Sequence, residues 1–361
     1  MSKNTCTAIV VQNRGEADAV EVNIPKLRDD YIIVLPIGSI LTASPSLDQE
    51  LAARLQRTSR KEIVSRDLFM EETQVYHEDG AFAEYVTAKG DLMIKVPGNL
   101  NDEEAATLGV GIATVGQALY QSLELLLPTK PSLEKPILLI YGGSTATGSL
   151  AIQYAKLSGF LVAATCSEHN FQYLKSLGAD ATFNYNSPTC SNDIKTWSND
   201  SIALAFDCIS EGSSPSITAS AMSSSGGIYT NILFVTPEEV HKINPKVQVK
   251  QTLAYSIFGD YFTFATLEFP GKPQDLEFSK MFWEMSRGLL EQGKLRVHRT
   301  SVNRYGNGFE GILKGLDALR KGEASGEKLV FTLPEAIGKS RNRHVMFLTY
   351  GTHLVAKFYK A

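Results

Sequence analysis

Cysteine is scarce in this sequence, and its placement argues against two kinds of site. The chain has only four cysteines, and no two of them form a Cys-x-x-Cys pair. A four-thiolate zinc site needs closely spaced ligands, and a disulfide framework needs a regular cysteine pattern, so we expect neither. The four are Cys6, Cys166, Cys190 and Cys208. Cys166 and Cys208 each end an apolar run, which predicts buried free thiols.

The sequence also lacks an excess of basic residues and any long hydrophobic run. The formal net charge is -4, so no basic field exists to attract nucleic acid or anionic lipid. No run of about 18 apolar residues is present, which argues against a membrane span. Residues 1–6 lack the apolar core of a signal peptide. We therefore expect a cytoplasmic protein without a nucleic-acid or membrane partner.

From Pro136 onward the sequence alternates between strand and helix patterns. Residues 137–141 and 160–165 are continuous apolar runs, as in strands buried on both faces. Helical patterns follow at 149–158 and 170–177, and each is stopped by a glycine. Further strands are expected at 181–183, 202–206 and 227–233, with a short helix within 210–225. This alternation predicts a doubly wound parallel sheet, a Rossmann domain, over residues 136–262.

The flanking regions have a different character. Strands are predicted at 8–11, 31–34, 82–86, 92–96 and 328–333, and helices at 276–292 and 309–320. Asn101 and Glu104 form a capping-box pattern that predicts a helix start. The small residues of 109–116 permit a close backbone approach. Contact with a ligand and helix-to-helix packing are both compatible with that segment.

The turn over residues 142–148 has the composition of a pyrophosphate site. Gly142, Gly143 and Gly148 keep bulky side chains away, so backbone amides and the helix dipole can face an anion. Ser144, Thr145 and Thr147 add hydroxyl donors, although Thr145 stands where a central glycine is common. A glycine-rich loop without a ligand is the alternative, but the strand before the turn and the helix after it favour nucleotide binding.

In dinucleotide-binding folds, the residue that selects between NAD and NADP lies about 20 residues downstream, at the end of the second strand. An acidic residue there binds the ribose hydroxyls of NAD and repels a 2′-phosphate. Thr165, Cys166 and Ser167 end this strand, and the hydroxyls, with His169 and Asn170, can hydrogen-bond a phosphate. Glu168 is the contrary residue, and we expect it to face solvent. NADP is favoured, while His169 could equally be an ordinary residue at a helix start.

Several motifs together resemble the medium-chain dehydrogenase/reductase superfamily. They are Gly80-Ala81-Phe82-Ala83-Glu84-Tyr85, the helix with Glu103 to Gly116, the turn 142–148, Leu177-Gly178-Ala179-Asp180, Phe206-Asp207-Cys208 and Gly326-Glu327-Lys328-Leu329-Val330. Within the superfamily the chain is most similar to fungal trans-acting enoyl reductases of polyketide and polyketide–peptide pathways. Residues 77–85, 141–148 and 166–170 carry this closer resemblance, which extends over 1–35 and 76–335.

The resemblance implies an activity and a partner. A polyketide synthase or a hybrid polyketide–peptide synthase (PKS-NRPS) with an inactive enoyl reductase domain presents an α,β-unsaturated thioester, and the separate reductase delivers hydride from NADPH to its β-carbon. A monomer is expected from the relatives. Two alternatives remain: a stand-alone quinone or enone reductase of the same superfamily, and a homologue that binds NADPH without catalysing a reaction.

The resemblance also implies site residues. The NADP contacts carried over are Ser144, Thr145, Ala146, Thr147, Ser167, Glu168, His169, Asn170, Tyr185, Ile232, Leu233, Ala324 and Ser325. The acyl channel carried over is Gly109, Val110, Gly111, Ile112, Ala113, Thr114, Val115, Gly116, Thr252, Leu253, Ala254, Tyr255 and Ser256. Thr114 is a candidate donor to a thioester enolate, although helix packing explains it equally well. No side chain must be the proton donor, and water can serve.

The expected fold class is α/β, with an incomplete GroES-like catalytic lobe and a Rossmann domain. The lobe covers 1–135 and returns at 263–335, and residues 336–361 form an atypical tail. Residues 35–75 lack the strands and the Asn-Pro turn of relatives, and 47–66 is charged and helix-tolerant. Either the lobe is remodelled in a working enzyme, or splice junctions are mispredicted. We expect 35–75 to pack poorly and to leave strand edges uncovered.

Zinc is disfavoured within this superfamily comparison. Zinc alcohol dehydrogenases carry a cysteine and a His–Glu pair in the N-terminal lobe. Here that lobe has only Cys6, at the extreme terminus, and His77-Glu78. We interpret His77 as a residue of a surface loop.

Overall fold

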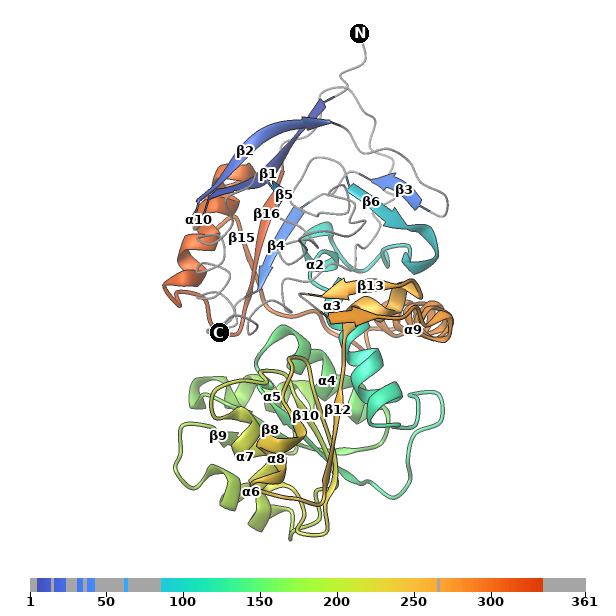
Figure 1. The fold of residues 1–361 in the computed structure, drawn as a ribbon, viewed down its shortest axis with the longest axis vertical. Helices are drawn as coiled ribbons and strands as arrows, with labels where there is room; N and C mark the ends of the chain where they lie inside the picture. The colour runs from blue at the N-terminus through green and yellow to red at the C-terminus, as the bar shows by residue number, and fades with distance from the viewer. Residues whose placement is uncertain are drawn as a thin grey trace. The chain divides into compact units, whose positions relative to one another are not determined.

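A computed structural model describes residues 5–13, 16–23, 31–34, 38–42, 62–63, 86–264 and 267–333. The chain forms two compact units, drawn in Figure 1. The first unit comprises Met1–Val110 and Tyr255–Ala361, and the second comprises Gly111–Ala254. The chain therefore leaves the first unit, builds the second, and returns.

The second unit is built on a six-stranded sheet in which all neighbouring strands are parallel. The strands are β7 (Ile137–Tyr141), β8 (Leu161–Cys166), β9 (Ala181–Asn184), β10 (Leu204–Asp207), β11 (Gly227–Asn231) and β12 (Val247–Gln251). Their order in space is β12-β11-β10-β7-β8-β9. This is the strand order of doubly wound dinucleotide-binding folds, with the switch point between β7 and β10. The predicted Rossmann domain is confirmed.

Helices cover the sheet in two groups. The helices α4 (Ala146–Leu157) and α5 (Phe171–Leu177) contact each other and the strands β7, β8 and β9. The second group is α6 (Cys190–Trp197), α7 (Ser214–Ala221) and α8 (Pro237–His241), in which α7 contacts both neighbours. Sheet faces covered on both sides explain why the strands read as continuous apolar runs.

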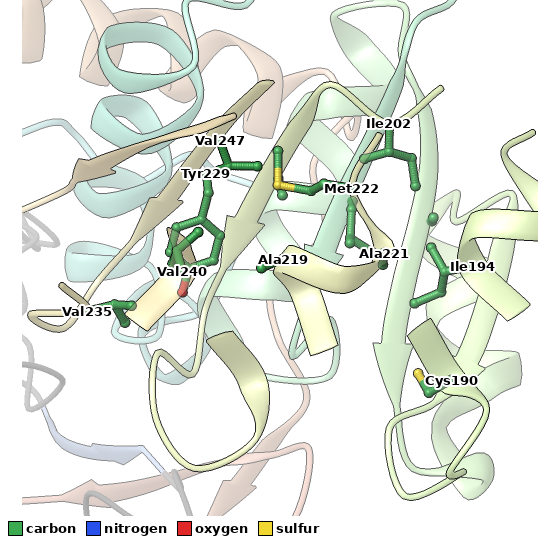
Figure 2. Packing of buried hydrophobic residues seen from close by; sticks show 13 residues of the cluster. Cys190, Ile194, Ile202, Ala219, Ala221, Met222, Tyr229, Val235, Val240 and Val247 are labelled. Carbon is green, nitrogen blue, oxygen red and sulfur yellow. The ribbon is translucent and has the colours of Figure 1, made fainter. Parts of the chain in front are cut away.

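Figure 2 shows the core between the second helix group and the sheet. Ile194 of α6, Ala219 of α7 and Val240 of α8 pack with Tyr229 of β11 and Val247 of β12. All five side chains are almost fully buried. Since burying one aliphatic side chain stabilises a fold by roughly 1.5–3 kcal/mol, this cluster is a main source of the unit's stability.

The second unit starts before the expected boundary at residue 136. Helix α3 (Gly109–Val115) continues into a π-helical segment, η3 (Gly116–Ser122), which contacts β11 and β12. The hydroxyls of Tyr120 and Ser158 lie 2.9 Å apart, and this hydrogen bond ties η3 to the end of α4. The helical segment therefore belongs with the sheet.

The described residues of the first unit form four small sheets. In one, β1 (Thr5–Asn13) pairs with β2 (Glu16–Asn23) and β5 (Glu62–Ile63), and in another β3 (Tyr31–Val34) pairs with β6 (Val86–Lys89). In the third, β16 (Lys328–Thr332) lies between β15 (Thr300–Val302) and β4 (Gly38–Thr42). The fourth is the hairpin of β13 (Phe262–Phe264) and β14 (Leu267–Phe269).

Three helices in the first unit match sequence predictions. The capping box is confirmed, because Glu104 N donates to Asn101 Oδ1 at 2.8 Å and Asn101 N donates to Glu104 Oε2 at 3.0 Å, and it begins α2 (Asp102–Ala105). Helix α9 (Pro273–Glu291) and helix α10 (Gly308–Arg320) occupy the expected regions.

Two predictions for the first unit were wrong. Residues 92–96 form no regular strand, because a 3-10 helix occupies Gly90–Leu92 and only an isolated bridge follows at Lys95. Leu92 and Ile94 are buried as the alternation predicted, but an extended segment becomes a strand only when a second strand lies beside it. The expectation of an uncovered edge also fails for β16, because Gly38–Thr42 pairs along it.

The structure describes only part of the segment 35–75, which was predicted to pack poorly. Glu62–Ile63 is a strand inside the segment interpreted as helix-tolerant. The remainder of 35–75, the motif residues 77–85 with His77, and the tail 336–361 lie outside the described residues.

Candidate functional site

The turn after β7 is held in a defined shape by the neighbouring strand β8. Gly142 N donates to Thr165 Oγ1 at 3.0 Å, and Gly143 N donates to Thr165 O at 2.8 Å. Gly142 has a φ of +78°, a conformation that favours glycine. The turn leads directly into α4, so its backbone lies at a helix N-terminus, where amides and the helix dipole favour an anion.

Two glycines of this turn lie in close contact with neighbouring atoms, and for Gly148 those atoms belong to the backbone. A Cβ on Gly148 would lie 2.3 Å from Gly142 O and 2.8 Å from Gly143 Cα. A Cβ on Gly143 would lie 2.7 Å from Leu174 Cδ2 of α5. These glycines therefore allow strand, turn and helix to approach closely, as the turn composition predicted.

Thr145 stabilises the turn from within. Its hydroxyl accepts a hydrogen bond from Gly148 N at 2.9 Å, which caps α4, and donates one to Gly142 O at 2.9 Å. The hydroxyl proton is thus engaged inside the turn. We therefore expect Thr145 to shape the site, while main-chain amides face a bound anion. Thr147 is buried, and Ser144 and Ala146 complete the predicted segment.

The ends of β8 and β9 carry the residues predicted to choose the cofactor. Ser167 Oγ donates to Tyr185 Oη at 3.2 Å, and Tyr185 lies beside Tyr141 with 6.2 Å between ring centres. His169 is exposed and hydrogen-bonds the buried Asn170 at 3.1 Å. These residues gather hydroxyl, imidazole and amide groups at one corner of the sheet.

Glu168 is exposed, as predicted, but it has a partner that the sequence did not indicate. Asn184 Nδ2 donates to Glu168 Oε1 at 2.9 Å. The acidic side chain at the position predicted to select the cofactor therefore hydrogen-bonds the last residue of the next strand.

Asp207, at the end of β10, is the centre of a buried hydrogen-bond network. Its carboxylate accepts from Ile209 N at 2.9 Å, Ser210 N at 2.8 Å, Ser214 Oγ at 2.7 Å and Tyr229 Oη at 2.9 Å. Burial raises the pKa of Asp207, and these four hydrogen bonds oppose that rise by stabilising the anion. The network determines the path of the chain after β10.

Ser210 links this network to the strand end that carries Ile232 and Leu233. It has a φ of +62°, unusual for a residue with a side chain. Its hydroxyl donates to Asp207 O at 2.9 Å and accepts from Ile232 N at 3.0 Å. Ile232 and Leu233, both predicted cofactor contacts, are buried. The loops after β10 and β11 are thus joined.

The cysteines near the site are poor nucleophiles. Cys166 and Cys208 are free and buried, as predicted. Burial raises the pKa of Cys166 to about 12 and raises that of Cys208 as well, so neither thiol is ionised near neutral pH. No thiolate chemistry is expected from them.

The structure brings part of the predicted acyl channel together. Thr252 follows β12, and its hydroxyl lies 3.0 Å from Ser122 Oγ, at the end of η3, and 3.0 Å from Thr230 Oγ1. The helix with Gly109 to Gly116 and the stretch with Thr252, Leu253 and Ala254 are therefore connected through η3. A π-helical turn inside a helix is frequent at functional sites.

The small residues of α3 have a packing role. A Cβ on Gly111 would lie 2.7 Å from Leu150 Cδ1 of α4, so this glycine permits two helices to approach. Thr114 is buried in the same helix. Val110, Ile112, Ala113, Val115 and Gly116 are buried too. Helix packing explains Gly111, and a role for Thr114 toward substrate stays a prediction.

Besides Gly109 and Val110, four predicted site residues belong to the first unit. Tyr255 is buried, and Ser256 Oγ donates to Asp275 Oδ2 at 2.5 Å. Ala324 is buried and Ser325 exposed, just before β16. These four stay predictions.

The described ranges contain neither a metal-binding cluster nor a membrane-spanning helix. Among those residues, no group of three or more His, Cys, Asp or Glu side chains could hold a metal ion. No helix in the same ranges is long and apolar enough to cross a membrane.

Comparison with known proteins decides the family. The chain is 40% identical over 354 residues to the trans-enoyl reductase ACTTS2 of Alternaria alternata, covering 91% of this chain and 99% of that protein. The chain belongs to the trans-enoyl reductases. It is therefore an oxidoreductase of the medium-chain dehydrogenase/reductase superfamily, as the motifs indicated.

Further relatives of this trans-enoyl reductase agree. It is 37% identical over 264 residues, 71% of each chain, to the enoyl reductase component lovC of the lovastatin nonaketide synthase of Aspergillus terreus. The family model described as zinc-binding dehydrogenase matches residues 146–266. A solved structure, the CurF ER cyclopropanase from the curacin A biosynthetic pathway, shares the fold with a TM-score of 0.65 at 17% identity, covering 91% of this chain and 99% of that one.

Sequence reasoning missed Asp207, Ser210 and Asn184 as supports of the site in this reductase. A signal existed for the first two, because an aspartate that ends a strand often accepts hydrogen bonds from amides just downstream. Asn184 had no comparable signal, since its partner is distant in sequence.

Proposed function

We propose that this protein is an NADPH-dependent enoyl reductase that acts in trans on a polyketide chain. Its substrate is the α,β-unsaturated thioester held on a polyketide synthase or PKS-NRPS. The observation that carries the proposal is the tight glycine turn 142–148, whose backbone lies at the N-terminus of α4, in a chain that belongs to the trans-enoyl reductases. A bound pyrophosphate fits such a turn.

The cofactor would be held by residues at the carboxyl edge of the sheet. Ser144, Thr145, Ala146 and Thr147 would hold the pyrophosphate by their main chain. Ser167, His169, Asn170 and Tyr185 would surround the 2′-phosphate, and Ile232, Leu233, Ala324 and Ser325 would contact the rest of NADP. NADPH supplies a hydride, which ends on the β-carbon of the acyl chain. The protein's contribution is placement of the two reactants.

The acyl chain would lie along the helix 109–116 and the stretch 252–256. Thr114 would donate a hydrogen bond to the thioester oxygen as the enolate forms, and water would supply the α-proton. We propose a zinc-independent reaction, since hydride transfer to an enoyl thioester needs no metal if an oxygen-directed donor is present. We also propose that the protein is a monomer in the cytoplasm.

The test presents two substrates to purified protein with NADPH. One is an enoyl chain on the carrier domain of a candidate synthase, and the other is a free enone or quinone. We expect oxidation of NADPH with the carrier-bound substrate, together with a product two hydrogens heavier by mass analysis. Faster turnover of the free enone would favour a stand-alone reductase. Tight NADPH binding without turnover of either would indicate an inactive homologue, a reading that the unusual residues 35–75 favour.

A zinc requirement is tested in the same assay. Activity should persist after dialysis against a chelator and should not rise on addition of zinc. Loss of activity that zinc restores would contradict the zinc-independent mechanism.

A further inference from the structure

Glu168 occupies a position where an acidic side chain normally opposes NADP. It follows the end of β8 by two residues, and an acid at this place binds the 2′-hydroxyl of NAD and repels a 2′-phosphate. The groups around it, Ser167, His169 and Tyr185, suit a phosphate. The chain therefore combines a phosphate-binding environment with a contrary charge.

The carboxylate of Glu168 is directed by Asn184, the last residue of β9. Asn184 Nδ2 donates to Glu168 Oε1 at 2.9 Å. The other end of the same amide is also occupied, because Asn186 N donates to Asn184 Oδ1 at 2.9 Å. The amide group therefore has one orientation, in which only its NH₂ faces the carboxylate.

The pairing of the two strands makes this contact possible. In the parallel ladder of β8 and β9, Cys166 is the partner of Asn184. The residues that follow are linked twice, once through Glu168 and Asn184 and once through the 3.2 Å hydrogen bond from Ser167 Oγ to Tyr185 Oη. One link arranges a hydroxyl pair for the phosphate corner, and the other holds the acid.

We propose that Asn184 is a positioning residue for cofactor specificity. It keeps the Glu168 carboxylate against β9 and out of the space of a 2′-phosphate, so that a chain with an acid at this position still prefers NADPH. This inference rests on the proposed use of NADPH. The recognised ligand is the 2′-phosphate of the adenosine ribose, and Glu168 discriminates against it only when released.

The proposal predicts that Asn184→Ala changes the binding of NADPH and of NADH differently. Asn184→Ala frees the carboxylate to approach the ribose, where it repels the phosphate and can accept a bond from a 2′-hydroxyl. A charge pair at about 4 Å in water corresponds to roughly a fivefold change in binding, so we expect Asn184→Ala to weaken NADPH by about that factor. Binding of NADH should be unchanged or tighter.

The experiment is a double-substitution cycle measured by calorimetry with NADPH and with NADH at low salt. The proteins are the wild type, Asn184→Ala, Glu168→Gln and the double variant. Glu168→Gln should change NADPH affinity by less than about twofold in the wild type, where the carboxylate is already held away, and by about fivefold in the Asn184→Ala background. Asn192→Ala, on the exposed side of α6, is the matched control and should leave both affinities unchanged.

The outcomes separate this inference from the proposed function. Equal effects of Glu168→Gln in both backgrounds, or equal weakening of NADPH and NADH by Asn184→Ala, would overturn the role of Asn184 while NADPH binding by the wild type stands. Wild-type protein that binds no dinucleotide, or that binds NADH more tightly than NADPH, would overturn the proposed cofactor and this inference with it. Restoration of NADPH affinity by the double variant supports the inference, because a merely unfolded corner would not recover.

Discussion

The hydroxyl of Ser210 bridges two loops by accepting a hydrogen bond from Ile232 N at 3.0 Å while it donates to Asp207 O at 2.9 Å. Ser210 follows β10, and Ile232 follows β11. Because β10 and β11 are adjacent parallel strands, their carboxyl ends meet at the same edge of the sheet. A single side chain therefore sets the spacing of two loops that are proposed to face the cofactor.

Removing that hydroxyl should weaken cofactor binding. Ser210→Ala keeps the backbone geometry but leaves Ile232 N without its acceptor, so Ile232 and Leu233 lose their support. A lost hydrogen bond of about 1 kcal/mol corresponds to a roughly fivefold weaker NADPH affinity. Calorimetric titration of the wild type and the variant measures the change in NADPH affinity. Ser216→Ala is the control, because that exposed hydroxyl bonds Ser213 O within its own helix region. Equal losses in the two variants would contradict the bridging role.

Tyr229→Phe should destabilise the fold through Asp207. The change removes one of four donors from a fully buried carboxylate and should reduce the free energy of unfolding by about 1–3 kcal/mol. Denaturant titration of both proteins gives the difference. The matched control is Tyr305→Phe, whose hydroxyl makes an exposed 3.3 Å bond to Glu323 and whose loss should change stability by under about 0.5 kcal/mol. Similar values for the two variants would show that the Asp207 network is unimportant.

Gly148→Ala should disrupt the turn between β7 and α4. The new Cβ would stand 2.3 Å from Gly142 O, a backbone atom that cannot rotate away. We expect a loss of about 1–3 kcal/mol in stability and the loss of measurable NADPH binding. Gly98→Ala tests whether any glycine substitution has this effect, because nothing lies within 4 Å of its Cβ. Normal NADPH affinity in Gly148→Ala would exclude this turn as the pyrophosphate site.

Because Lys328 is buried, we expect the free energy of unfolding to depend on pH. It is buried, donates to Thr107 O at 2.6 Å, and has its pKa lowered by burial to about 7 from the ordinary 10.5. Between these two values the unfolded chain keeps a proton that the folded protein releases, so the free energy of unfolding should rise with pH across this window. Below about pH 7 both states are charged and the penalty for burial is fully present.

The check uses Lys328→Met. Denaturant unfolding at several pH values between about 7 and 10 should show a flatter pH dependence than in the wild type. Lys321→Met, on an exposed residue at the end of α10, should leave the slope unchanged. An unaltered slope in Lys328→Met would assign the pH dependence to other groups.

Part of the fold could be predicted because its signals are local. The apolar runs of β7 and β8, the glycine that ends α5 and the Asn101–Glu104 capping box each involve neighbours within a few residues. By contrast, residues 92–96 show the alternation of a strand and form none, while Gly38–Thr42 becomes a strand by pairing with Lys328–Thr332. A strand forms only beside a second strand, and the local sequence pattern does not show which segment that second strand is.

The sequence by itself determined the doubly wound domain and the glycines of the turn 142–148, because hydrophobic period and backbone freedom act over a single turn or strand. Only the tertiary structure decided that Asn184 holds Glu168, that Tyr229 and Ser214 complete Asp207, and that Ser210 bonds Ile232. The Glu168, Tyr229 and Ile232 contacts join residues that lie on, or just after, different strands. Hydrogen bonds of this kind depend on which strand ends become neighbours, and that order follows from packing of the whole sheet.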